Sequence, residues 1–476
     1  MTTTELPEDT SALTARRFRR MSPASPQGLP PVVTEGLPPG PGWPALLQTM
    51  ALFRVRHRLH SYLHRRYGDV FTVRLVPGGR PLVFFTRPEH TREIFAGDPE
   101  VFHAGKGNAI LGPIMGEHSL LLQDSAQHHR ARKLIMPAFS GNALRGYRSL
   151  VAEVAAAEVD GWQEDAPFRA LERMNALTLE VILRVVFGVT DESRLARLRP
   201  RVNATVDISP AILLGWAYPR LQRYGPWRRT IDNQVELDRL MYAEIRERRH
   251  APDVAERTDV LSRLLESGDP DDPTDRLDDT ELRDQLVTLL LAGHETTASA
   301  LSWALYEVGR SADLLARTQR AADEGDGAWL EAVLKEAMRL HPIIPMVVRT
   351  LMEPATIGGL DLPAGTTVGP SIIVSHERPE NFPDPEVFRP ERFLADRNGG
   401  QTPAANTWIP FGGGVRRCIG AGFSLMEGTE VLREVFRRYD VAAVGADRPK
   451  VRNITSVPRN GARVRVTRRR PAPAPR

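Results

Sequence analysis

The single cysteine of the chain, Cys418, lies in a glycine-rich loop that carries positive charge. The loop reads Phe411-Gly-Gly-Gly-Val-Arg-Arg-Cys-Ile-Gly420. Cysteine acts as a nucleophile or metal ligand in its thiolate form, which nearby cations and a helix N-terminus stabilise. Arg416 and Arg417 supply the cations, and the glycines allow the backbone to approach a flat partner closely. From the residue type alone, a buried structural cysteine is the commoner alternative.

A second unusual segment, Leu290-Leu-Ala-Gly-His-Glu-Thr-Thr297, interrupts the longest helical pattern of the chain. The pattern extends to about residue 309, and it begins at Asp278, which forms a capping signature with Glu281. Glycine costs about 1 kcal/mol in a helix interior. Gly293 therefore breaks a local rule in the manner that often marks a functional site.

The polar residues of this segment have two simpler explanations. Threonine side chains can bond the backbone of their own helix and bend it. His294-Glu295 also resembles the start of the zinc motif His-Glu-x-x-His, but Ala298 occupies the position of the second ligand. The sequence thus excludes that zinc site, and it leaves the bent helix open.

The loop at the cysteine resembles the haem-binding loop of the cytochrome P450 family. It fits Phe-Gly-x-Gly-x-Arg-x-Cys-x-Gly without a mismatch, at Phe411, Gly412, Gly414, Arg416, Cys418 and Gly420. The resemblance implies that these residues bind haem b (iron protoporphyrin IX) and that Cys418 is the axial ligand of its iron. It covers about residues 36–466, where four separated motifs follow the order of the family.

The central helix resembles the Ala-Gly-x-(Asp/Glu)-Thr signature of the same family, at Ala292, Gly293, Glu295 and Thr296. We expect the two small residues to leave space for dioxygen beside the haem. We expect Glu295 and Thr296 to be catalytic, because a carboxylate and a hydroxyl can supply and relay protons. Positioned proton transfer typically contributes about 10²–10⁴-fold to a rate. The pair also argues against relatives that run directly on peroxide.

The resemblance also assigns two groups of charged residues. His128 and Arg132, four residues apart on one helix face, are similar to the pair that holds a haem propionate, although Ser125 stands where glycine is usual. Arg349 and Arg416 complete this propionate-binding group.

The second charged group is expected behind the haem loop. Glu336 and Arg339 are three residues apart on one helix, and Arg392 lies in a Pro-Glu-Arg-Phe segment. An exposed ion pair would contribute about 0–1 kcal/mol. The resemblance instead implies a buried network of the three residues, which fixes geometry more than it adds stability.

No flavin or iron–sulfur segment is evident in the sequence, so we expect electrons from a separate partner. The expected partners are a ferredoxin with its reductase, or a flavodoxin-type donor, and NAD(P)H acts only indirectly through them. Arg130, Lys133 and Arg417 are candidates for the docking face. The predicted substrate is a lipophilic small molecule, because the expected contact residues are apolar: Ile110, Leu111, Ala292, Ile344 and Val347.

Composition is ordinary for a soluble globular protein, with 41% hydrophobic and 26% charged residues and a net charge of +4. The basic excess is local, at Arg16–Arg20 and Arg468–Arg470, and we expect no nucleic-acid partner. A single cysteine permits no internal disulfide, and no apolar run reaches the ~18 residues of a membrane span. We predict a cytoplasmic monomer without a transmembrane anchor.

The predicted fold is mainly α with a small β-rich part, a single large cytochrome P450 domain crossed by the long central helix. We expect residues 1–35 to be a disordered tail, 36–466 the domain, and 467–476 a disordered basic tail. Residues 103–123 and 195–250 are expected over the substrate side, and 253–280 as a surface loop. Strands are predicted at 70–75 and 81–85, helices at 54–67, 86–95, 144–162, 174–189, 329–340 and 422–438, and a closing hairpin at 453–466.

The predicted function is that of a haem-thiolate monooxygenase that hydroxylates or epoxidises its substrate. A haem protein that only binds small molecules is one alternative, and the Glu295–Thr296 pair argues against it. A haem-thiolate enzyme that rearranges its substrate without external electrons is another alternative, and turnover without a reductant would reveal it.

Overall fold

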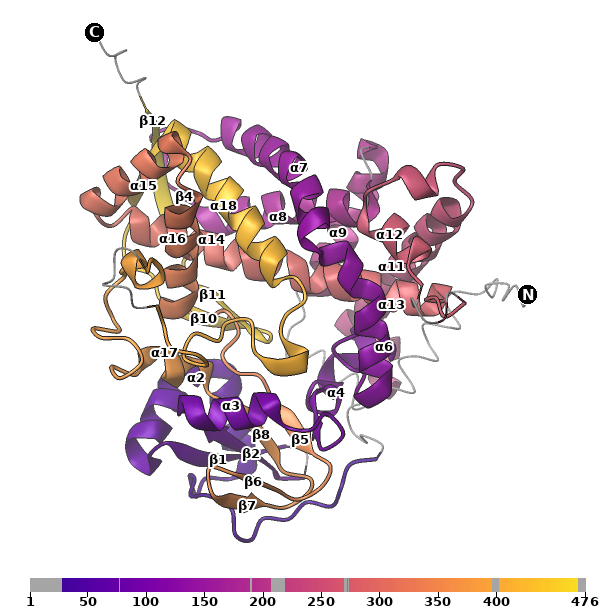
Figure 1. Ribbon diagram of the computed structural model, residues 1–476, viewed down its shortest axis with the longest axis vertical. Helices are drawn as coiled ribbons and strands as arrows, with labels where there is room; N and C mark the ends of the chain where they lie inside the picture. The colour runs from indigo at the N-terminus through magenta and orange to yellow at the C-terminus, as the bar shows by residue number, and fades with distance from the viewer. Residues whose placement is uncertain are drawn as a thin grey trace.

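The computed structural model describes residues 28–76, 78–188, 191–206, 219–268, 272, 274–395 and 402–469. Figure 1 shows a large helical part above a smaller β-rich part, so the predicted fold class is confirmed. The tail residues 1–27 and 470–476, and the apolar segment 207–218 of the predicted substrate lid, lie outside the described residues.

The β-rich part is built around the predicted hairpin of β1 (Val70–Leu75) and β2 (Arg80–Phe85). The two strands are antiparallel, and β2 continues the sheet through a parallel partner, β8 (Thr367–Pro370). The sheet ends with β5 (Arg349–Leu351) and β3 (Phe102–His103), in the order β1-β2-β8-β5-β3. This order carries Arg349 into the interior of the molecule, where it is 7% exposed.

The first helix of the described residues, α2 (Ala45–Tyr67), begins nine residues before the predicted start and is kinked at Val55, where φ is −135° and ψ is 30°. Arg56 follows the kink and is buried, which lowers the pKa of its guanidinium to about 10. Its donors reach the turn of a hairpin formed by β10 (Pro449–Arg452) and β11 (Thr455–Pro458). The acceptors are three consecutive carbonyls, those of Asn453 at 3.3 Å, Ile454 at 3.2 Å and Thr455.

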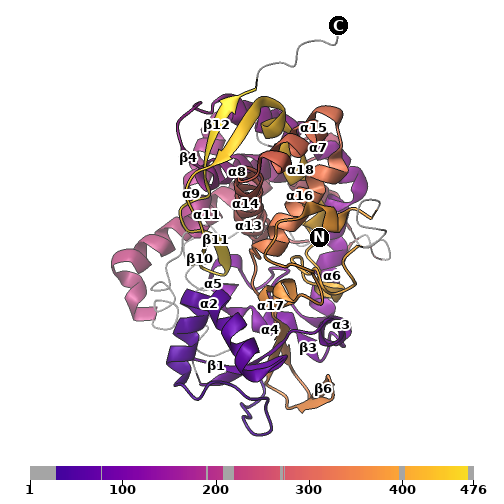
Figure 2. The ribbon, with the colours of Figure 1, turned by 90° about the vertical axis from the view of Figure 1, so that its left-hand side faces the viewer.

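The predicted central helix forms two consecutive segments, α13 (Asp279–Gly293) and α14 (Glu295–Val308), which meet at His294. The predicted capping box of Asp278 and Glu281 is confirmed. At the junction, the Thr178 hydroxyl of α8 (Ala170–Phe187) donates to the His294 carbonyl at 3.0 Å. Figure 2 shows the two segments in the middle of the helical part.

Gly293 lies against a neighbouring helix. A Cβ at this position would lie 2.9 Å from Ile182 Cδ1 of α8. On that side of the helix, the space that glycine leaves is therefore filled by a neighbouring helix. The missing side chain allows α8 and the central helix to pack closely, which is a common reason for glycine in a buried helix.

Most of the longer remaining helices contribute to the main hydrophobic core, whose largest buried side chains include Trp303 and Trp329, whereas α3 and α17 pack on the core of the β-rich part. In chain order, the remaining helices are α3 (Pro88–Ala96), α4 (Ala104–Gly107), η1 (Ala109–Leu111), α5 (Gly112–Met115), α6 (Ser125–Ile135), η2 (Met136–Phe139), α7 (Gly141–Asp160), α9 (Glu192–Val206), η3 (Pro219–Arg223), α11 (Gly225–Arg249), η4 (Val254–Glu256), α12 (Val260–Glu266), α15 (Ala312–Glu324), α16 (Gly327–Leu340), α17 (Ile372–Glu377), η5 (Pro390–Phe393), η6 (Gly414–Arg416) and α18 (Ala421–Arg438). The other strands are β4 (Phe168–Arg169), β6 (Ala355–Ile357), β7 (Leu360–Leu362), β9 (Tyr439–Ala443) and β12 (Arg463–Arg468).

Two sequence predictions of local structure were wrong in part. Residues 253–280 are not only a surface loop, because α12 lies within them and buries Val260, Leu261 and Leu264 in the core. Its apolar run is short and is flanked by acidic residues, so the sequence did not indicate a helix there. The predicted hairpin at 453–466 is also replaced: β10 pairs with β11, and β12 pairs with β9.

Candidate functional site

The loop of Cys418 joins η6 to α18 and is folded back on itself. The Cys418 amide donates to the Phe411 carbonyl at 2.9 Å. Gly414 has a φ of +62°, which glycine adopts without strain, and side chains at Gly413 or Gly414 would overlap Phe95 of α3. In the structure the close approach that these glycines permit is therefore to α3.

The protein around Cys418 does not by itself favour a thiolate. The side chain is accessible to solvent, yet desolvation by the surrounding protein raises the pKa of the thiol. The Gly420 amide and the charges of Arg417 and Arg132 lower the pKa by a smaller amount. The positive charge acts in the expected direction, but desolvation outweighs it. A metal that binds the sulfur displaces the proton directly.

Three arginines and a histidine from different parts of the chain converge near this loop: Arg132 and His128 of α6, Arg349 of β5, and Arg416 of η6. Burial and the positive charges of the three arginines lower the pKa of His128 to about 3. Burial also lowers the pKa of Arg349 to about 10 and that of Arg416 to about 10. The structure thus brings together the four predicted propionate-binding residues.

Asp124 is the carboxylate that faces this basic cluster. It occupies the N-cap position of α6, but its side chain makes no cap hydrogen bond there. Its oxygens instead accept from the amides of Gly105 at 2.8 Å and Lys106 at 3.1 Å, and pair with Arg416 Nη2 at 2.5 Å. Asp124 therefore connects α4 to the cysteine loop.

The charge balance of this cluster fits an anionic cofactor. Three partly or fully buried guanidinium groups and one carboxylate leave an excess of positive charge, which is costly away from water. A planar group with two carboxylates and a metal centre would offset this charge and give the nearby thiol a partner. Haem has these features, so the residues present fit the cofactor that the sequence predicts.

The predicted catalytic residues begin α14. The Thr296 hydroxyl donates to the Ala292 carbonyl at 2.8 Å, and Thr297 makes the same type of bond to Gly293 at 3.4 Å. The helix-bending explanation thus describes the geometry that is present. Ala292 itself is exposed, as a residue that lines an open space should be.

Glu295 points toward a polar cavity of about 250 Å³ and has a partner that the sequence does not indicate. Arg452 Nε of β10 lies 3.2 Å from its Oε1. The Arg452 side chain is 32% exposed, so the rim of the cavity reaches solvent. The other lining residues are Asn175, Asn203, Ala204, Val206 and His294.

The charged group behind the cysteine loop is assembled as the sequence suggests. Glu336 is fully buried and accepts from Arg339 Nε and Nη2, each at 2.8 Å, and from Arg392 Nε at 3.2 Å. The Arg389 amide adds a fourth donor at 2.9 Å. Arg339 in turn donates to the carbonyls of Pro385 and Val387, so the network joins α16 to the segment before the cysteine loop.

The predicted substrate-contact residues form two groups. Ile110 packs against Ile114, which also contacts Leu291, the neighbour of Ala292. Ile344 and Val347 pack on the core of the β-rich part, and Val347 lies beside Gly412 of the cysteine loop. Leu111 is half-buried in η1.

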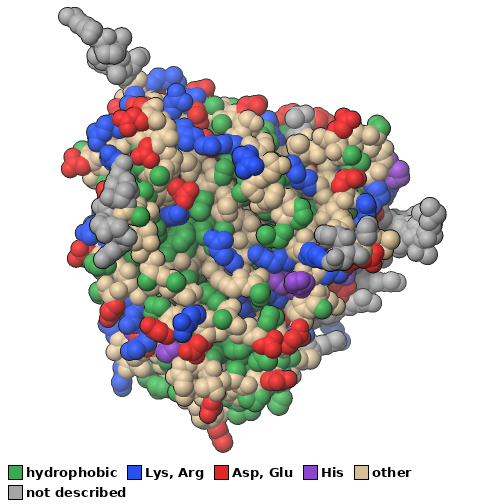
Figure 3. Space-filling view, in the orientation of Figure 1, with side chains coloured by type: hydrophobic (Ala, Val, Ile, Leu, Met, Phe, Trp, Pro, Cys, Tyr) green, Lys and Arg blue, Asp and Glu red, His purple; other side chains and the backbone are tan. Residues whose placement is uncertain are grey.

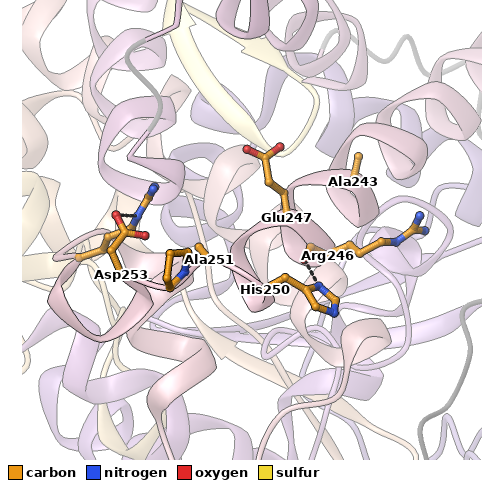
Figure 4. A pocket seen from close by; sticks show the side chains of 8 residues that line it. Ala243, Arg246, Glu247, His250, Ala251 and Asp253 are labelled. Atoms are coloured by element: carbon orange, nitrogen blue, oxygen red, sulfur yellow. Dashed lines mark hydrogen bonds and ion pairs between the residues drawn. The ribbon is translucent and has the colours of Figure 1, made fainter.

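Another hollow of the described surface lies elsewhere, on α11 and η4 (Figure 4). Its side chains include His250, which bonds the Arg246 carbonyl at 2.8 Å, and Asp253, which pairs with Arg257 at 3.0 Å. These are local surface contacts. Among the described residues, no group of three or more His, Cys, Asp or Glu side chains could hold a metal ion.

The arrangement of a thiol, a basic cluster and an interrupted central helix has a match among known families. A family model described as Cytochrome P450 matches residues 38–465. The chain belongs to the cytochrome P450 family. The prediction of a haem- and oxygen-dependent monooxygenase class is confirmed at the level of the family.

Individual P450 relatives agree with this assignment. Two proteins of Mycobacterium tuberculosis carry the provisional names cytochrome P450 135A1 and cytochrome P450 135B1. They are 51% identical over 437 residues and 41% identical over 439 residues. The alignments cover 91% and 90% of this chain, and 96% and 91% of the relatives.

A solved P450 structure confirms the fold. The cyanobacterial CYP120A1 with bound retinoic acid matches with a TM-score of 0.78 and 24% sequence identity, over 92% of this chain and 100% of that chain. P450 enzymes generally use redox partners. Within the described part of this P450, no helix is long and apolar enough to cross a membrane.

Sequence reasoning missed two partners of the site. The acceptor function of Asp124 was missed, because it depends on Arg416, 292 residues away. Arg452 was not singled out at all, since a lone arginine in a strand carries no local signal. The predicted docking residue Arg130 also has another role, because it pairs with Asp275 at 2.7 Å and Glu281 at 2.6 Å.

Proposed function

We propose that this P450 hydroxylates or epoxidises a lipophilic small molecule, with haem b held at Cys418 and electrons from a separate redox partner. The observation that carries the proposal is the convergence of Arg132, Arg349 and Arg416 beside a single thiol, with Asp124 as the facing carboxylate. When bound, haem supplies the iron at which dioxygen is activated for transfer of one oxygen atom to the substrate.

The residues of the chain then have defined tasks in holding the cofactor. Cys418 would ligate the iron. The hydrogen bond from its backbone amide to the Phe411 carbonyl holds the residue in the orientation needed for this. His128, Arg132, Arg349 and Arg416 neutralise the propionates. Gly412 and Gly420 keep the loop narrow on either side of the ligand. The network of Glu336, Arg339 and Arg392 keeps the loop in place from behind.

Proton delivery is assigned to Glu295 and Thr296. Glu295 reaches the polar cavity whose rim is open to water at Arg452. Thr296 lies next in the chain, and its hydroxyl can exchange the bond to the Ala292 carbonyl for a bond to a ligand on the exposed side of the helix. The carboxylate therefore takes protons from the solvent side, and the hydroxyl passes them to the oxygen pocket.

Electrons are assigned to a ferredoxin with its reductase, or to a flavodoxin-type donor, with NAD(P)H as the indirect source. Figure 3 shows Lys and Arg side chains gathered over the middle of one face, around the start of α18 and α6. Arg417 is exposed there, beside the thiol ligand, whereas Arg130 is occupied by its own ion pairs. We therefore assign the centre of the docking face to Arg417.

The docking assignment predicts that Arg417→Gln weakens partner-supported reduction, because an acidic partner loses a contact at the centre of the interface. Arg459, which is exposed on another part of the surface, provides the matched control Arg459→Gln. Equal effects of the two substitutions on the apparent Kd for the partner would contradict the assignment.

The remaining assignments concern the molecule as a whole. We assign residues 36–466 to one catalytic domain that acts as a monomer in the cytoplasm, with a substrate pocket lined by Ile110, Leu111, Ala292, Ile344 and Val347. Sedimentation of the haem-loaded protein should give the mass of one chain. A concentration-dependent dimer would contradict the monomer.

The decisive experiment is the spectrum of the reduced, carbon-monoxide-bound protein. We expect the red-shifted Soret band of a thiolate-ligated haem in the wild type and its loss in Cys418→Ser. A band at the position of a histidine-ligated haem would refute the ligand assignment. Oxygen consumption with product formation, supported by surrogate redox partners, then separates a monooxygenase from a haem protein that only binds small molecules.

A further inference from the structure

The segment Gly116–Leu121, here called the access segment, lies between the central helix and the cysteine loop. Leu120 connects the two directly. Its amide donates to Gln285 Oε1 of α13 at 3.1 Å, and its carbonyl accepts from Arg416 Nη1 at 3.2 Å. The access segment is therefore fixed on both sides.

Side chains of α13 hold the access segment through consecutive residues. Asp284 Oδ2 accepts from the His118 amide at 3.0 Å and lies 3.3 Å from His118 Nδ1. Gln285 donates to the His118 carbonyl, and the Thr288 hydroxyl donates to Ser119 Oγ at 2.7 Å. Asp284, Gln285 and Thr288 of α13 therefore all bind the access segment.

A buried arginine supports these contacts from beneath. Arg283 is 0% exposed and pairs with Asp284 at 2.7 Å and with Asp238 of α11. It also donates to the carbonyls of Met115 at 3.1 Å and Ile114 at 3.4 Å. Gly116, with a φ of +93°, allows the chain to lie directly on Asp284, because a Cβ there would overlap the carboxylate.

The same contacts place an apolar wall beside the oxygen pocket. Ile114 packs with Ile110, Leu291, Trp227 and Ile231, and Leu291 precedes Ala292 in the central helix. The position of this wall therefore depends on whether the access segment stays attached to α13.

We propose that Asp284 is a positioning residue for the substrate: with His118 it latches the access segment to α13, and release of this latch admits ligands to the haem side. The inference rests on the proposed function, since it assigns the wall to a substrate pocket. His118 is the titratable member at the solvent edge, with a side chain that is 31% exposed, whereas Asp284 is 3% exposed.

The charged groups around His118 determine the direction of its pH response. Asp284, Glu281 and the adjacent Glu117 raise the pKa of His118 above its ordinary value, and the hydrogen bond to Asp284 is the largest cause. Arg283 and Asp238 face Asp284 from below, and Arg130 pairs with Glu281. The charged latch is therefore complete below about pH 6.5 and is lost as the pH rises through the raised pKa.

The first test measures amide hydrogen exchange in the access segment of wild type and His118→Gln, at pH values of about 6 and 9. Glutamine can bond to Asp284 but does not titrate, and comparison at each pH cancels the intrinsic pH dependence of exchange. The measured quantity is the ratio of the wild-type exchange rate to the rate in His118→Gln. We expect this ratio to be about fivefold smaller at the lower pH than at the higher pH. His250→Gln, at the surface hollow on α11, is the matched control and should behave as wild type, because the His250 side chain bonds the Arg246 carbonyl of α11.

The second test measures stopped-flow binding of imidazole and 4-phenylimidazole to the haem-loaded protein by the Soret shift. The association rate of the larger azole should rise with pH in wild type and in His250→Gln, and should be independent of pH in His118→Gln. Asp284→Asn should bind the larger azole faster at both pH values. Because this substitution also removes a partner of the buried Arg283, His118→Gln serves as the variant that leaves Arg283 undisturbed.

Two results would overturn the latch. One is a ratio of wild-type to His118→Gln exchange that is the same at both pH values, and the other is a change in exchange without a change in azole association. The exchange test does not depend on haem chemistry. A failure of the proposed function, seen as a missing thiolate band, is therefore distinguishable from a failure of the latch.

Discussion

Replacement of Glu336 by glutamine should be the most damaging conservative change in the cysteine-side scaffold. The carboxylate is 0% exposed and accepts four hydrogen bonds, three of them from Arg339 and Arg392. Glutamine has one oxygen, and its NH₂ group would face guanidinium donors. Both arginines would remain buried without a counter-charge.

Breaking a buried ion pair by removing one partner costs about 3–5 kcal/mol. The total free energy of unfolding of a domain is about 5–15 kcal/mol, so Glu336→Gln should lose roughly a fifth of it or more. Glu331 provides the control on the same helix. Its side chain is 40% exposed and pairs with Lys335, a surface contact worth about 0.5 kcal/mol.

The assay is urea unfolding of the haem-loaded protein, followed by far-UV circular dichroism and by the Soret band. Glu336→Gln should unfold at lower urea in both signals, with the Soret change first, because the network joins α16 to the segment that precedes the cysteine loop. Glu331→Gln should be close to wild type. A difference between the two variants below about 1 kcal/mol would refute the role of the network.

Three further predictions concern the site itself. Thr296→Ala should lower the amount of product formed per dioxygen consumed, because the relay hydroxyl is lost. Thr297→Ala is the control and should not lower it, because the Thr297 hydroxyl faces Ser424. Equal coupling in the two variants would contradict the relay. In haem-free protein, alkylation of the accessible Cys418 by iodoacetamide should rise only above the pH range of an ordinary cysteine. The reason is that desolvation by the surrounding protein raises the pKa of the thiol and so preserves its unreactive form. A normal pH profile would contradict this. Gly414→Ala should weaken haem retention and lower the free energy of unfolding by about 1–3 kcal/mol, because alanine is strained at a positive φ and its Cβ would overlap α3. Gly146→Ala, in open space on α7, is the control and should be neutral or stabilising.

The sequence was most informative where a property depends on neighbours in the chain. The capping box of Asp278 and Glu281 spans four residues, and the β1–β2 hairpin is set by a short turn. Both were predicted and confirmed. The residues of the cysteine loop were likewise found from one continuous motif, and the long helical pattern revealed the central helix.

Properties that depend on distant contacts were not predictable in this way. The purpose of Gly293 is decided by Ile182, and the pKa of Cys418 is decided by how much protein surrounds it. The His118–Asp284 contact spans 166 residues. Local patterns encode which residues can form a helix or a cap. They do not encode which buried charge will meet which partner.

The clamp of Arg56 on the hairpin turn has a consequence for the order in which the enzyme is made. Arg56 and its acceptors are separated by 397 to 399 residues. At typical ribosome speeds, the interval between their synthesis is roughly 20–80 s. During this time the kinked first helix contains a cationic side chain whose final acceptors do not yet exist. The N-terminal part of the enzyme can therefore reach its final form only after nearly the whole chain has been translated.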